Sequence, residues 1–327
     1  MKKLHEVLAN LRRINPTLLS TYYVLATFAA AFLLAVFRIF ILPHKAEDFN
    51  IQSFATSGAC FAFNAVMVIL LIVIFCMRYT LQYQVEEPKK KVRRFLRNLP
   101  GKSDAAPRLS LRTVRPSLPR PYMPGSMRMF NALLAVMSLL CAVYGFVLAS
   151  RATNVVFFYY MLAMGSVFNG AYFFYITRVQ NRCAPGTLYL ALIPVVWNAM
   201  RVLDIFIRIS TYASAGYHAS QLLSSCAVTL FFLYEARMYL PDKVLWKPAT
   251  HFTFACMSIL TIGCDALPRI LSVVMYGYAE QQLYFALFDL ILLVALVQRL
   301  ILPRTRHNLQ VPNTQFLHEN NQEQKQE

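Results

Sequence analysis

The sequence predicts an all-α polytopic integral membrane protein with eight transmembrane helices, paired as four helical hairpins, and with both termini on the inside. Two features of the composition predict this class: 57% of the 327 residues are hydrophobic and only 14% are charged, with a mean hydropathy of +0.46. A soluble domain has about 25% charged residues. The third observation is a series of apolar runs of about 20 residues, the length that an α-helix needs to cross a bilayer. They lack the alternation that strands of a membrane barrel require.

The predicted helices divide the chain into a membrane domain, residues 18–302, and three segments outside it. The apolar runs are Leu18–Leu42, Phe54–Met77, Phe130–Ser150, Val155–Ile176, Leu188–Ile209, Gln221–Tyr239, Phe252–Tyr276 and Leu283–Leu302. Residues 1–17 form the N-terminal segment, and residues 303–327 form a polar tail that we expect to be disordered. We expect the first helix to be an uncleaved signal-anchor, because no small-x-small cleavage site follows it.

The net charge of +17 is explained by topology rather than by nucleic-acid binding. Of the 32 lysines and arginines, the outside connections hold only Lys45, Arg151 and Arg208. Three more, Arg38, Arg201 and Arg269, lie within helices, and the rest fall in inside segments. Positive charge gathers on the cytoplasmic side of membrane proteins. The sequence therefore predicts cytoplasmic termini and a location in the cell membrane, and no nucleic-acid partner.

The basic, proline-rich loop at residues 79–128 is inserted between the second and third helices. Its stretch "KKKVRRFLRNL" is expected to form a short amphipathic helix on anionic headgroups, and the part beyond Gly101 to be disordered. The alternative is an electrostatic switch or a docking site for a partner protein. The sequence favours contact with anionic lipid.

A weak repeat accompanies the four hairpins. The fragment "DIFIRIST" begins at Asp204 and "DALPRILS" begins at Asp265, and both contain Asp-x-x-x-Arg-Ile. Arginine recurs near the outer end of the odd-numbered helices, at Arg38, Arg151, Arg208 and Arg269. Shared ancestry of the hairpins and ordinary interfacial anchoring by arginine both explain this pattern.

Charged residues inside the predicted membrane helices form the candidate site. An ionised side chain at the bilayer centre costs about 2.5–3.5 kcal/mol on insertion scales, so it marks a functional hypothesis. Two stripes at helical spacing place polar groups on one face each: Asn198, Arg201, Asp204 and Arg208 in the fifth helix, and Ser258, Thr261, Asp265, Arg269 and Ser272 in the seventh. Asp289 in the eighth helix joins them. Glu235 is expected to snorkel beside Arg237 at the inner end of the sixth helix.

Pro268 is expected to kink the seventh helix next to these charges. A proline lacks a backbone N–H, so the carbonyl of Cys264, four residues earlier, loses its helical partner. The sequence therefore predicts an open carbonyl, an acid and a base within one turn.

Two interpretations of these charges remain open. In the first, Asp204–Arg208 and Asp265–Arg269 pair at i, i+4 spacing and stabilise the bundle only. In the second, a polar pocket opens to the outer face, and one carboxylate without a basic partner is protonated or binds a cation or an amine. Arg38 is a further base that is able to supply the missing charge.

The sequence contains no motif that binds a cofactor or a metal ion, and no catalytic motif. No helix carries a buried lysine for retinal, and no phosphate loop or CxxC pair is present. Two aspartates alone do not match an intramembrane aspartyl protease. We therefore expect a non-enzymatic protein without a cofactor.

Three functions compete. The first is a ligand-sensing or regulatory membrane subunit with an outward-facing Asp/Arg site, which acts through a cytoplasmic or membrane partner because the chain has no output domain. The alternative is a small-solute or proton-coupled secondary transporter. A lipid-modifying enzyme is the third, and it lacks the required nucleophile or metal site. The sequence favours the first.

Overall fold

A computed structural model describes residues 16–41, 58–97, 125–152, 155–178, 187–211, 215–237, 248–276 and 283–307 of the chain. Within these residues it contains helices and no β strand. The helices are α2 (Pro16–Ile41), α4 (Gly58–Arg97), α5 (Gly125–Arg151), α6 (Val156–Arg178), α7 (Thr187–Ala191), α8 (Ile193–Thr211), α9 (Ala215–Ala236), α10 (Pro248–Tyr276) and α11 (Leu283–His307). The all-α prediction is confirmed.

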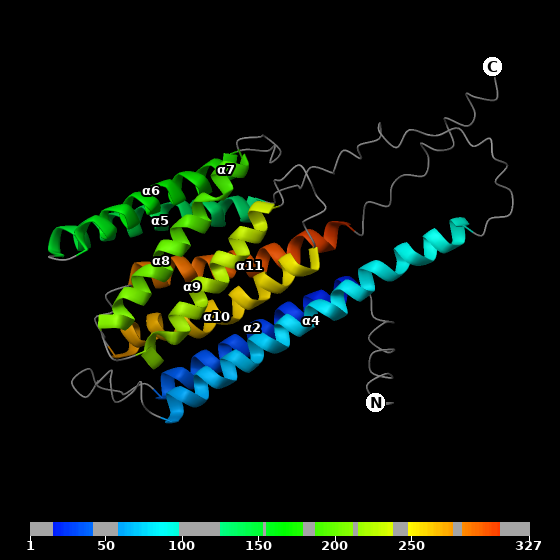
Figure 1. The fold of residues 1–327 in the computed structure, drawn as a ribbon, viewed down its shortest axis with the longest axis horizontal. Coiled ribbons are helices and arrows are strands. Elements are labelled where there is room, and N and C mark those ends of the chain that lie inside the picture. The colour runs from blue at the N-terminus through cyan, green and yellow to red at the C-terminus, as the bar shows by residue number, and fades with distance from the viewer. Residues whose placement is uncertain are drawn as a thin grey trace, which may run out of the picture.

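The helices follow one another as hairpins in chain order; α5 packs with α6, α8 with α9, and α10 with α11, whereas α2 and α4 each pack more extensively against α10 than against each other. In Figure 1, α2, α5, α8 and α10 run toward the left, and their partners return toward the right. We call the left end, where successive helices of each pair meet, the hairpin end. The right end, where α2 begins and α11 finishes, is called the open end. The even number of long helices thus places the start of α2 and the finish of α11 at one end.

Seven of the described helices are long and apolar enough to cross a membrane, which supports the membrane class but not the exact count of eight. Among the eight predicted segments, the one whose helix falls short is the sixth, α9, which forms close to the predicted position. Its polar side chains are buried inside the bundle: Ser220, Gln221, Ser224, Ser225 and Glu235. These residues lower the apolar content of α9. They are buried because they face other helices rather than lipid. The count of eight spans remains a prediction.

Several predicted boundaries are wrong. The fifth segment divides into α7 and α8 at Leu192, because Pro194 has no N–H to continue the helix. The basic stretch is no separate short helix; it continues α4 without a break to Arg97. The tail expected to be disordered from Pro303 is helical as far as His307. Residues 1–15, 98–124 and 308–327 lie outside the described residues, as do the disorder predictions made for them.

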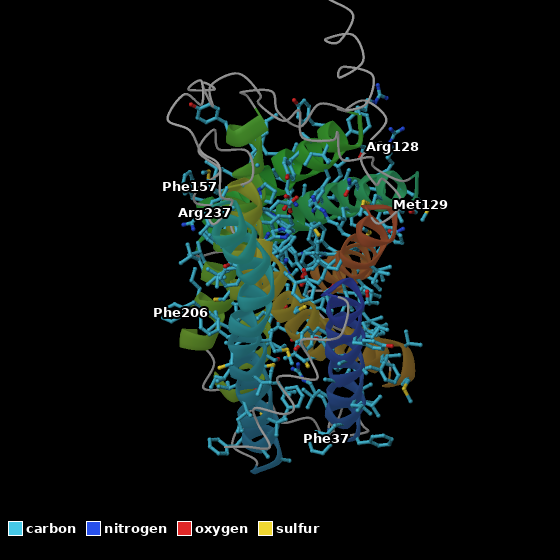
Figure 2. The ribbon with its side chains drawn as sticks, turned by 90° about the vertical axis from the view of Figure 1, so that its right-hand side faces the viewer. Phe37, Arg128, Met129, Phe157, Phe206 and Arg237 are labelled. Carbon is cyan, nitrogen blue, oxygen red and sulfur yellow. The ribbon has the colours of Figure 1, made fainter. Side chains whose placement is uncertain are left out.

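The bundle presents large apolar side chains on its surface. Figure 2 views it from the open end, with Phe37, Phe157 and Phe206 at the periphery. These rings are 48%, 76% and 61% exposed. A water-soluble protein rarely carries extended apolar patches of this kind, whereas lipid chains solvate them at no cost. The surface is therefore typical of a bundle surrounded by a bilayer.

Helix α10 is the central element of the bundle. It packs against α2, α4, α9 and α11. Of its membrane span, 67% of the residues are buried, against 22% of the span of α4. Because α10 is enclosed on several sides, its polar stripe meets neighbouring helices instead of lipid. This position makes it the scaffold of the candidate site.

Candidate functional site

The six intramembrane charges predicted as site residues are all buried. Arg38, Arg201, Asp204, Asp265, Arg269 and Asp289 are between 1% and 5% exposed. Arginine at a helix end usually anchors at the interface with its head in water. The burial of Arg38 and Arg269 excludes this explanation for the two of them. The exposed side chain of Arg151 remains compatible with it.

Asp265 is the centre of the first cluster, which we call the Asp265 node: Arg38, Ser220, Asp265 and Arg269. Arg38 Nη1 donates to Asp265 Oδ1 at 3.2 Å and Arg269 Nη1 donates to Asp265 Oδ2 at 3.3 Å. Ser220 Oγ accepts from Arg38 at 2.6 Å and donates to Asp265 at 3.1 Å. The node therefore connects α2, α9 and α10 through one carboxylate.

The carbonyl released by Pro268 has a partner in this node. Helix α10 continues through Pro268, and the Cys264 carbonyl accepts a hydrogen bond from Arg38 Nη1 at 3.1 Å. The predicted open acceptor is thus present, and a charged donor from another helix satisfies it. A hydrogen bond to a charged group contributes roughly 1.5–3 kcal/mol. The bend expected at Pro268 remains a prediction.

A close approach of α2 to α10 brings Arg38 within reach. A Cβ on Gly263 would lie 2.8 Å from the Cβ of Ala31, closer than two carbon atoms can pack. Arg38 lies two turns beyond Ala31 along α2, and helical side chains tilt back toward the N-terminus. Its guanidinium therefore reaches the turn of α10 that contains Asp265. Gly263 is needed here because any side chain would separate the two helices.

The second cluster contains Arg201 of α8 and Asp289 of α11. Arg201 donates to both carboxylate oxygens, Nη1 to Oδ1 at 2.8 Å and Nη2 to Oδ2 at 2.6 Å. It also donates to Asn198 Oδ1 at 3.2 Å, and Asn198 donates to the Pro194 carbonyl at 2.8 Å. Two parallel charge-assisted bonds are the strongest geometry that arginine and a carboxylate form.

Aromatic rings enclose the Arg201 guanidinium. Its central carbon lies 5.1 Å from the Trp197 ring, 5.2 Å from Phe285 and 5.9 Å from Phe288. Cation–π attraction at a desolvated site contributes about 2 kcal/mol or more. The indole N–H of Trp197 donates to Ser166 Oγ at 2.7 Å, which fixes the ring. The charge is therefore compensated on its edge by the carboxylate and on its faces by the rings.

The two clusters are connected by the packing of α10 against α11, the helices that carry Asp265 and Asp289. Together they contain three arginines and two carboxylates. Arg38 and Arg269 both pair with Asp265, Arg201 pairs with Asp289, and Asp204 also has an interaction. Whether one carboxylate lacks a basic partner stays a prediction. The predicted Asp265–Arg269 pair is confirmed, whereas the side chain of Arg208 lies outside those described.

Glu235 forms an ion pair that the sequence prediction missed. It is 2% exposed and pairs with Arg299 of α11, so it does not snorkel beside Arg237. Arg237 instead lies over the Tyr234 ring, 5.4 Å from its centroid. The sequence contains no local signal for this pair, since its members are 64 residues apart.

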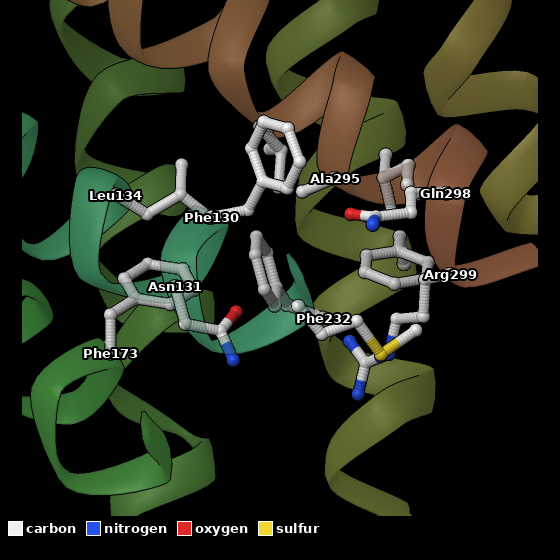
Figure 3. A pocket seen from close by; sticks show the side chains of 12 residues that line it. Phe130, Asn131, Leu134, Phe173, Phe232, Ala295, Gln298 and Arg299 are labelled. Atoms are coloured by element: carbon white, nitrogen blue, oxygen red, sulfur yellow. The ribbon is translucent and has the colours of Figure 1, made fainter. Parts of the chain in front are cut away.

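A small cavity lies between α5, α6, α9 and α11, beside the Glu235–Arg299 pair (Figure 3). Its volume is about 30 Å³, enough for about one water molecule. Four phenylalanines line it together with Asn131, Gln298 and Arg299, and none of the six predicted site residues does. It is therefore separate from both clusters.

No match was found among protein-family models, curated proteins or solved structures. The chemistry of the clusters is thus inferred from their geometry alone. Within the described part of the chain, no three His, Cys, Asp or Glu side chains are grouped so as to hold a metal ion. The clusters consist of paired charges that connect helices.

Proposed function

We propose that this chain is a sensory or regulatory membrane subunit, which responds at its hairpin end and acts through a partner protein at its open end. The observation that carries the proposal is the Asp265 node. There, Arg38 of the first hairpin makes hydrogen bonds to α9 and α10 at 2.6–3.2 Å. We call this set of hydrogen bonds between α2 and the helices α9 and α10 the lock. A stimulus that favours the separated state over the bonded state shifts the population between the two.

The α2/α4 hairpin depends on this lock more than it would in water. Apolar contacts between helices add little in a bilayer, because lipid chains solvate an exposed leucine equally well. Helix α4 exposes much of its apolar surface, including Phe61, Ile69 and Ile72. The free energy that holds α2 to α10 therefore rests on close packing, as at Gly263, and on Arg38.

A ligand at the hairpin end acts by competing within the node. An anion that binds the Arg38 guanidinium, or a cation that binds Asp265, stabilises the state in which the two are separated. The Arg38 guanidinium also lies over the Phe63 ring of α4, 5.5 Å from its centroid, and α4 continues past the open end, so displacement of Arg38 acts on α4 and its basic continuation. The signal thus crosses the membrane as a movement of one hairpin.

The pairing of the carboxylates favours this function over a proton-coupled transporter. A coupling carboxylate has to release and rebind a proton or a cation in each cycle. Asp265 faces two arginines and Asp289 is held by both oxygens, so their negative charge is compensated throughout. Such groups are suited to a lock rather than to a carrier.

Distance measurements between spin labels test the proposal. Labels at Met77 on α4 and Ile301 on α11, in protein reconstituted in nanodiscs, report the position of the first hairpin. We expect Asp265→Asn to shift or broaden the distance distribution in folded protein. The matched control is the double variant Arg201→Met/Asp289→Leu, which leaves the first hairpin in place. An unchanged distribution in Asp265→Asn, or proton flux in liposomes that Asp265→Asn or Asp289→Asn abolishes, contradicts the proposal.

The proposed orientation has a test of its own. We propose eight spans in the cell membrane, with the open end and both termini in the cytoplasm, on the basis of the charge asymmetry of the sequence. Reporter fusions after Arg128 and Arg306 are expected to be cytoplasmic, and one at Glu280 external. A reversed pattern at any of the three sites defeats this topology.

A further inference from the structure

Helix α4 extends well beyond the length that a membrane requires. Its apolar span is Gly58–Met77, and the helix then continues for a further 20 residues to Arg97. At about 1.5 Å per residue, this continuation measures about 30 Å. Figure 1 shows it in cyan, projecting past the open end of the bundle in the same direction as the rest of α4.

The last nine residues of this continuation carry a dense positive charge. The sequence from Lys89 to Arg97, "KKKVRRFLR", contains six lysines and arginines and no acidic residue. Val92 and Leu96 are four residues apart, so they belong to one face of the helix. We call residues 89–97 the basic segment. Its composition is that of a helix that binds an acidic surface with an apolar strip.

The position of the basic segment separates it from the lipid headgroups. By helical rise, Lys89 lies about 18 Å and Arg97 about 30 Å beyond Met77, the end of the apolar span. The headgroup layer is about 6 Å thick on each side of the hydrocarbon core. The backbone of this segment thus lies about 12–24 Å beyond the headgroup layer, more than the Debye length of about 8 Å, so attraction of its charges to anionic lipid is largely screened.

We infer that the basic segment of α4 is a docking site for an acidic surface on a partner protein, not a membrane-surface anchor. The inference rests on the proposed function, which requires a partner at the open end, and it names the chemistry of that partner. Clustered positive charge steers an acidic protein toward a site and sets its binding rate.

Two measurements on the full chain in nanodiscs test the inference. In the first, a fluorophore on Val92→Cys reports its depth through quenching by headgroup-labelled lipid, in neutral phosphatidylcholine and in discs that contain phosphatidylserine. We expect little quenching in either. Strong quenching in the anionic discs places the segment on the lipid surface and overturns the inference.

In the second measurement, polyglutamate serves as an acidic probe in neutral discs. We expect the triple reversal of Lys89, Lys90 and Lys91 to glutamate to weaken its binding roughly tenfold, since each surface pair contributes a few tenths to 1 kcal/mol. The control reverses Arg304 and Arg306 and is expected to change binding by less than about twofold. Equal binding by the wild type and the triple variant overturns the inference.

These outcomes are independent of the proposed sensory function. Static binding of polyglutamate requires no movement of the first hairpin, so it persists even where the spin-label distances do not change. Conversely, a hairpin that moves while the basic segment lies on lipid supports the sensory function and refutes only the docking site.

Discussion

Gly263→Ala is the sharpest perturbation of the α2–α10 contact. The added methyl group would lie 2.8 Å from the Ala31 Cβ, about 1 Å less than the usual carbon–carbon contact distance. Helix α2 must therefore move away by about 1 Å. Arg38 Nη1 lies 3.1 Å from the Cys264 carbonyl and 3.2 Å from Asp265, so this movement takes both contacts beyond hydrogen-bonding distance.

The cost follows from these two losses. Overpacking a tight helix contact costs about 1–3 kcal/mol. Each hydrogen bond to a charged group contributes roughly 1.5–3 kcal/mol, although part is recovered when α2 tilts rather than translates. The gain in helix propensity from glycine to alanine is only about 1 kcal/mol. We expect a net loss of roughly 2–4 kcal/mol in the free energy of unfolding.

The assay is thermal unfolding of the purified protein in detergent. The readout is the fraction of protein that remains monodisperse after heating. Gly58→Ala is the matched control, because a Cβ at Gly58 meets no atom within 4 Å. The exchange of the two small residues, Gly263→Ala with Ala31→Gly, is expected to recover most of the loss. If Gly263→Ala and Gly58→Ala unfold at the same temperature, the close-contact argument is wrong.

Three further predictions concern the charged clusters. Asp289→Asn leaves Arg201 buried without its carboxylate and is expected to cost about 3–5 kcal/mol in the same unfolding assay, whereas Asp289→Leu with Arg201→Met approaches the wild type; equal losses contradict it. Pro268→Ala restores a backbone donor for the carbonyl one turn earlier, so it is expected to reduce the cost of Arg38→Met by about 1 kcal/mol, and strictly additive effects would refute this. Trp197→Phe removes an indole hydrogen bond but keeps a ring beside the guanidinium, so thermal unfolding is expected to show a loss of about 1 kcal/mol in the free energy of unfolding. A loss as large as that of Asp289→Asn contradicts the view that the carboxylate stabilises Arg201 more than the indole hydrogen bond does.

The faces of the polar helices were predictable because they follow from helical periodicity alone. Spacings of three and four residues placed Asp265 and Arg269 on one stripe, and the chemistry of Pro268 identified the Cys264 carbonyl as a free acceptor. Both belong to a single helix, where sequence distance determines spatial distance. The structure confirms the pair and adds the partner of the carbonyl.

The contacts between helices were not predictable in the same way. Nothing local to Arg201 identifies Asp289, 88 residues later, as its carboxylate, because periodicity does not say which faces meet. Gly263 was visible as a small residue, but its contact with Ala31 depends on α2 packing beside α10. The same limit applies to Glu235, which was placed beside Arg237 and instead pairs with Arg299.

The pairing of Arg38 with Asp265 also constrains the order in which the protein is made. The two residues are 227 positions apart, and the first hairpin carries an arginine whose carboxylate belongs to the last hairpin. Until α10 has been synthesised and inserted, Arg38 of α2 lacks the Asp265 carboxylate that it contacts in the folded bundle. Completion of the chain thus becomes a condition for a stable N-terminal hairpin. A product truncated before α10 is expected to be recognised by membrane quality control and degraded.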